Sequence, residues 1–408
     1  MRFSGHFRRC GVLPALMAAI VCGSSLAAAA ADNSPVPQPP RSSANETPTD
    51  PLARRVDKAI AISSRRYLTA GVHSPWQIMH GLLALRQSYV LKLNGKKINA
   101  LKWIASGAKF EGEYWFQTTE YGGQAHPYNR PYAFQGHVCQ FLAILSMSDL
   151  PTSYQFHVAD NQTITIADMV RNAQMKVNSE DEISWTLWAL AHYLSPDARW
   201  VNNRGERWSI ERLVAVQTAE PDWNAACGAS HALFALSYAR NRYLQTGRRL
   251  RGTWRKADRD IQRHISLVQR YQNGDGTFSA NYFQGPKFSR SFDKRLSTSG
   301  HTLEWLMVAL PDERLGEDWV REGVAAIARE MIDNRSRPAR CGSLYHALDA
   351  LILYRERTRP QTARLTHITQ PAVKPSRPSV RIPVVEIRKP PVVNLRKPVV
   401  AIKPHVTR

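Results

Sequence analysis

Five histidines recur in one short pattern along the chain, and their spacing is the first sign of chemistry in this sequence. An apolar residue follows each histidine after two positions and leucine after five, as in His231-Ala-Leu-Phe-Ala-Leu236. The five are His80, His137, His231, His301 and His346, and Trp185 begins a sixth copy. Imidazole gains or loses a proton near neutral pH, so the pattern indicates acid–base catalysis or ligand binding.

In a helix, the apolar positions of this pattern fall on the face opposite the histidine, because each residue turns the helix by about 100°. That face is expected to pack against a partner helix. The residue three places after the histidine shares its face. These residues are Leu83, Gln140, Trp188, Phe234, Glu304 and Asp349. Their mixture of aromatic, polar and charged types favours a cavity wall over a packed core.

Two histidines have a carboxylate one helical turn away, His301 with Glu304 and His346 with Asp349. Such a carboxylate can orient an imidazole for proton transfer, so we assign these four residues and His231 a catalytic role. The expected ligand-binding residues are His80, His137, Gln140, Trp185, Trp188, Phe234 and Trp305. The alternative is structural, with histidines that bond neighbouring helices and hold them together.

Several histidines together with Cys227 or Cys341 could ligate zinc. However, the sequence has one such ligand per predicted helix, and neither Cys-x-x-Cys nor His-Glu-x-x-His occurs. We therefore expect no metal ion and no other cofactor.

The pattern recurs about every 45 to 70 residues, which is typical of a repeat architecture. An amphipathic helix is predicted before each repeat helix, so the chain has six helical hairpins. These first helices are expected at 52–68, 98–108, 166–175, 210–219, 254–271 and 319–332, and the helix of His80 at 76–93. We expect the hairpins to close into an all-α (α/α)6 toroid over 51–357, with an open solenoid as the alternative. Two insertions, Phe110–Tyr132 and Gln272–Gly300, are expected to border its pocket.

The two ends of the chain differ in composition from the middle. Residues 1–31 are typical of a secretory signal peptide, and 32–50 of a flexible linker. The tail, 358–408, repeats Pro-Val-Val segments with lysine and arginine and is expected to be disordered. It supplies about +10 of the formal net charge of +22, so the folded part is only moderately basic. We expect a secreted, periplasmic or envelope-associated monomer whose tail binds an acidic envelope polymer or lipid surface, and no nucleic acid.

Two segments resemble the terpenoid cyclase and protein prenyltransferase superfamily, which includes the squalene cyclases. Tyr271–Phe278, Tyr-Gln-Asn-Gly-Asp-Gly-Thr-Phe, is similar to its Gln-x-x-Asp-Gly-Ser-Phe turn, and Ser184–Leu190 to its inner helices. The resemblance covers Leu52–Tyr354 and implies an α-α toroid. It does not imply that family's chemistry, because the Asp-x-Asp-Asp motif of the cyclases is absent. Of the prenyltransferase zinc ligands, only Tyr345-His346 has a counterpart.

A second resemblance is carried by Gly300-His-Thr-Leu-Glu-Trp305, which is similar to the Gly-His-x-x-Glu-Trp segment of the sugar 2-epimerases. These are also (α/α)6 barrels, and their histidine acts as an acid or base at a sugar carbon. We therefore expect a His-lined pocket that binds, and processes, a carbohydrate or another anionic envelope ligand. The alternatives are a non-catalytic envelope scaffold and a cyclase-like lipid enzyme, so the sequence leaves open whether the chain is an enzyme.

Overall fold

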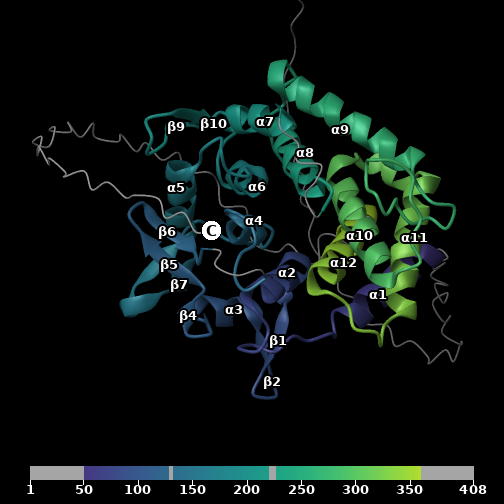
Figure 1. Cartoon of the computed structure of the whole chain (residues 1–408), viewed down its shortest axis with the longest axis horizontal. Coiled ribbons are helices and arrows are strands. Elements are labelled where there is room, and N and C mark those ends of the chain that lie inside the picture. The colour runs from purple at the N-terminus through teal and green to yellow at the C-terminus, as the bar shows by residue number, and fades with distance from the viewer. Residues whose placement is uncertain (1–49, 128–131, 220–226, 360–408) are drawn as a thin grey trace, which may run out of the picture. The chain divides into compact units, whose positions relative to one another are not determined.

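The computed structural model describes residues 50–127, 132–219 and 227–359; the predicted signal peptide, the linker up to residue 49 and the tail from residue 360 lie outside these ranges. The described residues are rich in helix, as predicted (Figure 1). The α-helices are α1 (Pro51–Ser63), α2 (Pro75–Leu85), α3 (Ala100–Ala105), α4 (Gln140–Ser146), α5 (Ile166–Lys176), α6 (Ser184–Tyr193), α7 (Ile210–Ala219), α8 (Ser230–Leu244), α9 (Gly252–Arg270), α10 (Phe292–Ala309), α11 (Asp318–Asp333) and α12 (Cys341–Thr358). Three short 3-10 helices lie at Arg86–Ser88, Ala159–Asn161 and Asp312–Gly316.

The all-α prediction was wrong in one respect, because short antiparallel strand pairs connect several helices. The pairs are β1 (Val90–Leu93) with β2 (Lys96–Asn99), β3 (Lys109–Phe110) with β4 (Glu113–Tyr114), β5 (Phe116–Thr119) with β6 (Gly122–Ala125), β7 (Gln155–His157) with β8 (Thr163–Thr165), and β9 (Arg199–Val201) with β10 (Arg207–Ser209). The 3-10 helix Arg86–Ser88 and β1 replace the end of the helix predicted at 76–93, and β2 overlaps the start of the one predicted at 98–108. Asn94 and Gly95 between them both have positive φ, which is the turn chemistry of a tight hairpin.

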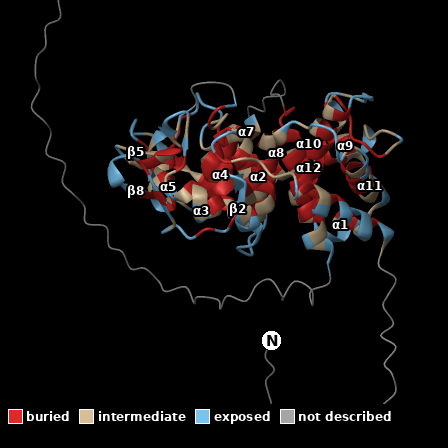
Figure 2. Ribbon diagram, turned by 90° about the horizontal axis from the view of Figure 1, so that it is seen from below, coloured by how far each residue is buried: buried red, intermediate tan, exposed pale blue. Residues whose placement is uncertain are grey.

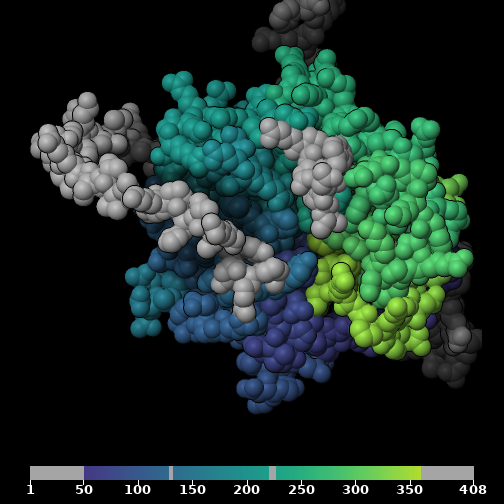
Figure 3. Space-filling model, viewed as in Figure 1, coloured from purple at the N-terminus to yellow at the C-terminus, as the bar shows by residue number. Residues whose placement is uncertain are grey.

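The even-numbered helices contact one another in chain order from α2 to α12, and α12 in turn contacts α2. The odd-numbered helices lie outside them: α7 contacts α6 and α8, α9 contacts α8 and α10, and α11 contacts α10 and α12 (Figure 1). The space-filling view shows purple residues near the start of the described chain beside yellow residues of α12 (Figure 3). Contacts between α2 and α12 therefore join segments that are far apart in the sequence.

Burial follows this arrangement. Buried residues gather in α2, α4, α8, α10 and α12, whereas α1 and the strands β5 and β8 carry much exposed surface (Figure 2). α9 is typical of an outer helix, because Trp254, Ile261 and Ile265 form a buried stripe and its remaining surface is mostly charged. The even-numbered helices are buried on several sides, so their polar residues must find partners or line a cavity.

The segment that resembles the cyclase turn ends α9 and ties it to α10. The Gln272 side chain donates to the Gly276 carbonyl at 3.0 Å, and Asp275 accepts from the Thr277 backbone N–H at 3.0 Å. The other Asp275 oxygen pairs with Arg295 of α10 at 2.6 Å. Gly276 has a φ of 85°, which a residue with a Cβ adopts only with strain. In this protein the motif therefore serves as a structural joint.

One glycine sets the distance between α10 and α12. A Cβ on Gly300 would lie 3.0 Å from the Cβ of Ala347 and 3.1 Å from its backbone nitrogen. The two helices can approach this closely only because residue 300 lacks a side chain. The next residue on α10 is His301 and the residue before Ala347 on α12 is His346, so the same contact brings two of the repeat histidines together.

Candidate functional site

A cavity of about 1120 Å³ lies at the N-terminal turns of five even-numbered helices. All five repeat histidines line it. Its wall consists of Trp76, Gln77, His80, Tyr132, Gly136, His137, Gln140, Cys227, His231, Ser291, Asp293, Lys294, Ser297, His301, Arg340, Cys341, Gly342, Ser343 and His346. The N-terminal end of a helix carries partial positive charge, so this cavity favours ligands with negative charge.

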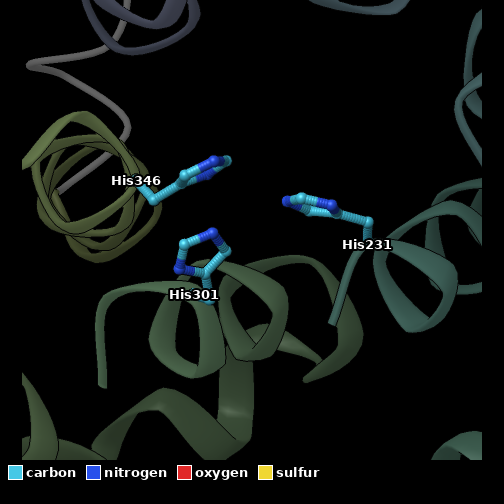
Figure 4. A group of neighbouring side chains, drawn as sticks. All are labelled: His231, His301 and His346. Carbon is cyan, nitrogen blue, oxygen red and sulfur yellow. The ribbon is translucent and has the colours of Figure 1, made fainter. Parts of the chain in front are cut away.

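Three of the histidines form a compact group in which α8, α10 and α12 each supply one ring (Figure 4). The ring centroids of His301 and His346 are 4.0 Å apart, and each lies 5.3 Å from the His231 ring. His80 stands beside the group, 5.3 Å from His346 between ring centroids, and His137 stands on the other side, 5.8 Å from His231. The structure therefore places five histidines from five repeats within one continuous cluster.

Hydrogen bonds to the backbone fix the rings of two histidines. Nδ1 of His80 lies 2.6 Å from the carbonyl oxygen of Trp76, and Nδ1 of His301 lies 2.7 Å from that of Ser297. A carbonyl oxygen only accepts, so both Nδ1 atoms carry the proton and donate it. The Nε2 atom of each neutral ring then keeps its lone pair free for a ligand.

His346 is fixed by a carboxyl group on the neighbouring helix. Its Nδ1 lies 2.7 Å from Oε2 of Glu304, and both side chains are buried. Glu304 is hydrogen-bonded in turn to Asp349, and Asp349 pairs with Arg86 at 2.6 Å. Burial raises the pKa of Glu304 to about 8, and it raises that of Asp349 well above its ordinary value. The raised pKa therefore favours a protonated Glu304 at neutral pH.

The pairing across helices corrects the sequence-based assignment. We predicted that His301 would pair with Glu304 and His346 with Asp349, each within its own helix. In the structure His301 donates to its own backbone, Glu304 reaches across to His346, and Asp349 lies behind Glu304. Glu304 and Asp349 are not part of the cavity wall. They support His346 from behind and do not face a ligand.

The other two histidines are held differently. His137 lies on the turn that precedes α4, and its Nδ1 is hydrogen-bonded to the carboxylate of Glu182, which lies just before α6. His231 is the second residue of α8, and its two ring nitrogens are shielded from solvent without a hydrogen-bond partner among the described residues. Shielded polar atoms without partners are uncommon in native proteins, so the two nitrogens of His231 call for a bound group.

The electrostatics of the cluster keep the imidazoles neutral. Burial, together with the neighbouring histidines, lowers the pKa of His80, His231 and His301 well below the ordinary value. Burial and the nearby His137 lower the pKa of His346 to about 3. At neutral pH these rings are therefore neutral, and each has one nitrogen with a lone pair that can bind a hydrogen-bond donor or a metal ion.

Four aromatic residues predicted to bind a ligand do not line the cavity, although the Trp185 ring packs against the His231 ring with centroids 4.6 Å apart. Trp185, Trp188, Phe234 and Trp305 are buried and are not part of the cavity wall. Trp188 packs against Phe234 with ring centroids 4.2 Å apart, and Trp305 donates to Ser237 at 3.0 Å. These side chains form core because the predicted cavity face of each helix also contacts the neighbouring even-numbered helix. By contrast, Gln140 does line the cavity.

The structure also shows site residues that the pattern missed. Lys294 and Arg340 line the cavity and are exposed, and both lie at or just before the first turn of a repeat helix. Cys227 and Cys341, which were considered only as zinc ligands, also belong to its wall. The signal that could have found Lys294 and Arg340 is their position shortly before a repeat histidine.

The two insertions differ in their relation to the cavity. The second supplies Ser291 and Ser297 to the wall, as expected. The first forms the short strands from β3 to β6, and β6 packs against α5. Only its last residue, Tyr132, lines the cavity, and its residues 128–131 lie outside the described ranges.

In comparisons with protein-family models, curated proteins and solved structures, none matched this chain. The residues and the geometry must therefore carry the functional argument. Among the described residues, no helix has both the length and the apolar character needed to cross a bilayer.

Proposed function

We propose that the chain is an exported (α/α)6 toroid whose central cavity binds an anionic ligand and acts on it through the lone pairs of its histidines. The toroid is supported by the order of helix contacts, in which each even-numbered helix meets the next and α12 meets α2. An open solenoid predicts no contact between its first and last repeats. The similarity of Tyr271–Phe278 to the cyclase-superfamily turn supports the same fold.

The observation that carries the functional proposal is the cavity of about 1120 Å³ with five histidines in its wall. Its volume suits a ligand the size of one or a few sugar rings. Two cations, Lys294 and Arg340, outnumber the one carboxylate of the wall, Asp293, and helix N-termini add partial positive charge. A sugar acid or another carboxylated or phosphorylated carbohydrate therefore fits better than a neutral one. The histidines would then bind the ligand, and the negative charge of the ligand would raise their pKa so that one of them can accept a proton, in line with the similarity to sugar 2-epimerases.

The same observation weighs against the two alternatives. A cyclase-like lipid enzyme needs a cavity lined by aromatic residues, but Trp188, Phe234 and Trp305 are packed in the core. A purely structural protein predicts a filled centre. The backbone hydrogen bonds of His80 and His301 fit a structural role, but they use only one nitrogen of each ring and leave the other for the cavity.

Export and the role of the tail remain parts of the proposal that rest on the sequence. The signal peptide is expected to be cleaved near residue 31, and the basic tail is expected to bind an acidic envelope polymer or lipid surface. Mass spectrometry of the mature chain would test the cleavage. A full-length N-terminus on the exported protein would contradict it.

A ligand screen tests the pocket. The purified chain is heated with neutral sugars, sugar acids and anionic polysaccharides, and the shift in melting temperature is compared with that of the double variant His301→Ala/His346→Ala. We expect the acidic ligands to stabilise the wild type and to lose most of this effect in the double variant. His157→Ala, on the exposed strand β7, is the matched control. Equal shifts in wild type and double variant would overturn the site assignment.

A further inference from the structure

We propose that His231, His301 and His346 bind one divalent transition-metal ion, with zinc as the first candidate, on the floor of the cavity. Each residue offers one ring nitrogen, and the three atoms lie within 4.8 Å of one another (Figure 4). In a tetrahedral zinc site the nitrogens are about 3.3 Å apart, since each Zn–N bond is about 2.05 Å. The three nitrogens would therefore have to move closer together when the ion binds.

The hydrogen bonds behind the rings have the form that metal ligands require. A histidine that binds a metal through one nitrogen nearly always donates from the other to a carboxylate or backbone carbonyl. His346 donates to Glu304 at 2.7 Å, and His301 donates to the Ser297 carbonyl at 2.7 Å. Both bonds involve Nδ1, so Nε2 is the ligand atom in each case. The rings are thus held in the orientation in which a metal ion would use them.

His231 gives a second, independent reason. Both of its ring nitrogens are shielded from solvent and lack a hydrogen-bond partner among the described residues. Leaving a polar group in this state is unfavourable. The ring lies between His137 and His346, and a metal ion shared with His301 and His346 would satisfy one nitrogen of His231.

Three histidine ligands leave further coordination positions, and here these face the cavity. Three protein ligands with an open position are typical of catalytic zinc, where water or a substrate oxygen completes the shell. Neutral imidazoles do not cancel the charge of the ion, so a bound Zn²⁺ would add positive charge to a cavity that already favours anions. The metal would then bind the carboxylate or phosphate of the ligand and activate a water molecule. This role rests on the proposed function, whereas metal binding itself does not.

The proposal replaces the expectation of no metal that the sequence supported. Each ligand comes from a different repeat, so no short ligand motif exists to be found. Cys227 and Cys341 line the same cavity but do not belong to the three-residue group. An all-imidazole set of ligands suits zinc, copper, nickel and iron. Cobalt(II) serves as a spectroscopic substitute for zinc.

The test is metal titration of the whole chain, purified without a polyhistidine tag and stripped with a chelator. We expect one zinc ion per chain by calorimetry, and visible absorption bands of tetrahedral cobalt(II). His231→Ala, His301→Ala and His346→Ala should each weaken zinc binding by about 100-fold or more, because even a lost supporting hydrogen bond weakens a site by about 10–100-fold. His157→Ala should bind as the wild type does. Circular dichroism checks that each variant is folded, and glutamine replaces alanine where it is not.

The outcomes separate this inference from the proposed function. Absence of stoichiometric binding, or binding that none of the three substitutions weakens, overturns the metal site. A ligand from the screen that binds the metal-free wild type then leaves the proposed pocket in place. Zinc binding that depends on the three histidines, with no ligand found, supports the metal site and counts against the proposed ligand class.

Discussion

Replacing Glu304 offers the sharpest test of how the cluster is built. Glu304→Leu removes the acceptor of the His346 Nδ1–H and the hydrogen-bond partner of Asp349, and both groups are buried. Each buried group left without a partner costs about 1–3 kcal/mol. We therefore expect the free energy of unfolding to fall by about 3–4 kcal/mol, near the middle of the summed range.

Glu304→Gln should behave very differently. Because burial raises the pKa of Glu304 to about 8, its side chain is mostly protonated at neutral pH, and a neutral amide can take its place with little change. Its oxygen accepts from His346, and its NH₂ group donates to Asp349. The expected loss is below about 1 kcal/mol, since both hydrogen bonds remain. The matched control is Glu322→Leu on the exposed face of α11, which should change stability by no more than about 0.5 kcal/mol.

The assay is urea unfolding at about pH 7 without metal, followed by circular dichroism. The quantity of interest is the difference in the free energy of unfolding between Glu304→Leu and Glu304→Gln. If Glu304→Gln lowers the free energy of unfolding as much as Glu304→Leu does, Glu304 carries its charge in the folded state. If Glu304→Leu leaves the free energy of unfolding unchanged, Glu304 does not fix the orientation of the His346 ring.

Two further predictions concern pH and helix spacing. The buried histidines stay neutral in the folded chain, whereas those of the unfolded chain take up protons below about pH 6.5. The free energy of unfolding should therefore fall as pH drops from about 6.5 towards 3. The loss is up to about 1.4 kcal/mol per pH unit for each group. The contribution of Glu304 to stability changes with pH in the opposite direction. Its pKa is about 8 in the folded chain and 4.5 in the unfolded chain, so this contribution is lost as pH rises between these values. In Glu304→Gln, the urea midpoint should therefore decline less over this pH range. Gly300→Val should destabilise the chain by about 2 kcal/mol and weaken zinc binding, because the new side chain pushes Ala347 away and separates α10 from α12. Unchanged unfolding and zinc titrations for this variant would show that the close contact does not set the site.

The helical repeats could be predicted from the sequence because their signal is local. Apolar residues two and five places after each histidine mark a buried helix face, and the helix predicted at 210–219 has the bounds of α7. The same apolar periodicity did not indicate the strand pairs. Leu91 and Leu93 continue the apolar pattern of α2, but Arg86 has a φ of 53°, which ends the helix, and the turn at Asn94 and Gly95 reverses the chain.

The sequence determined which residues could form a site, since five histidines at one position of a repeat must recur on equivalent faces. Only the tertiary structure decided how they pair. Position in a helix cannot show that Nδ1 of His301 bonds to its own backbone or that Glu304 reaches His346 on the next helix, because both depend on the distance between α10 and α12. That distance is set where Gly300 meets Ala347, residues from two different repeats. The same contact brings the rings of His301 and His346 to 4.0 Å between centroids.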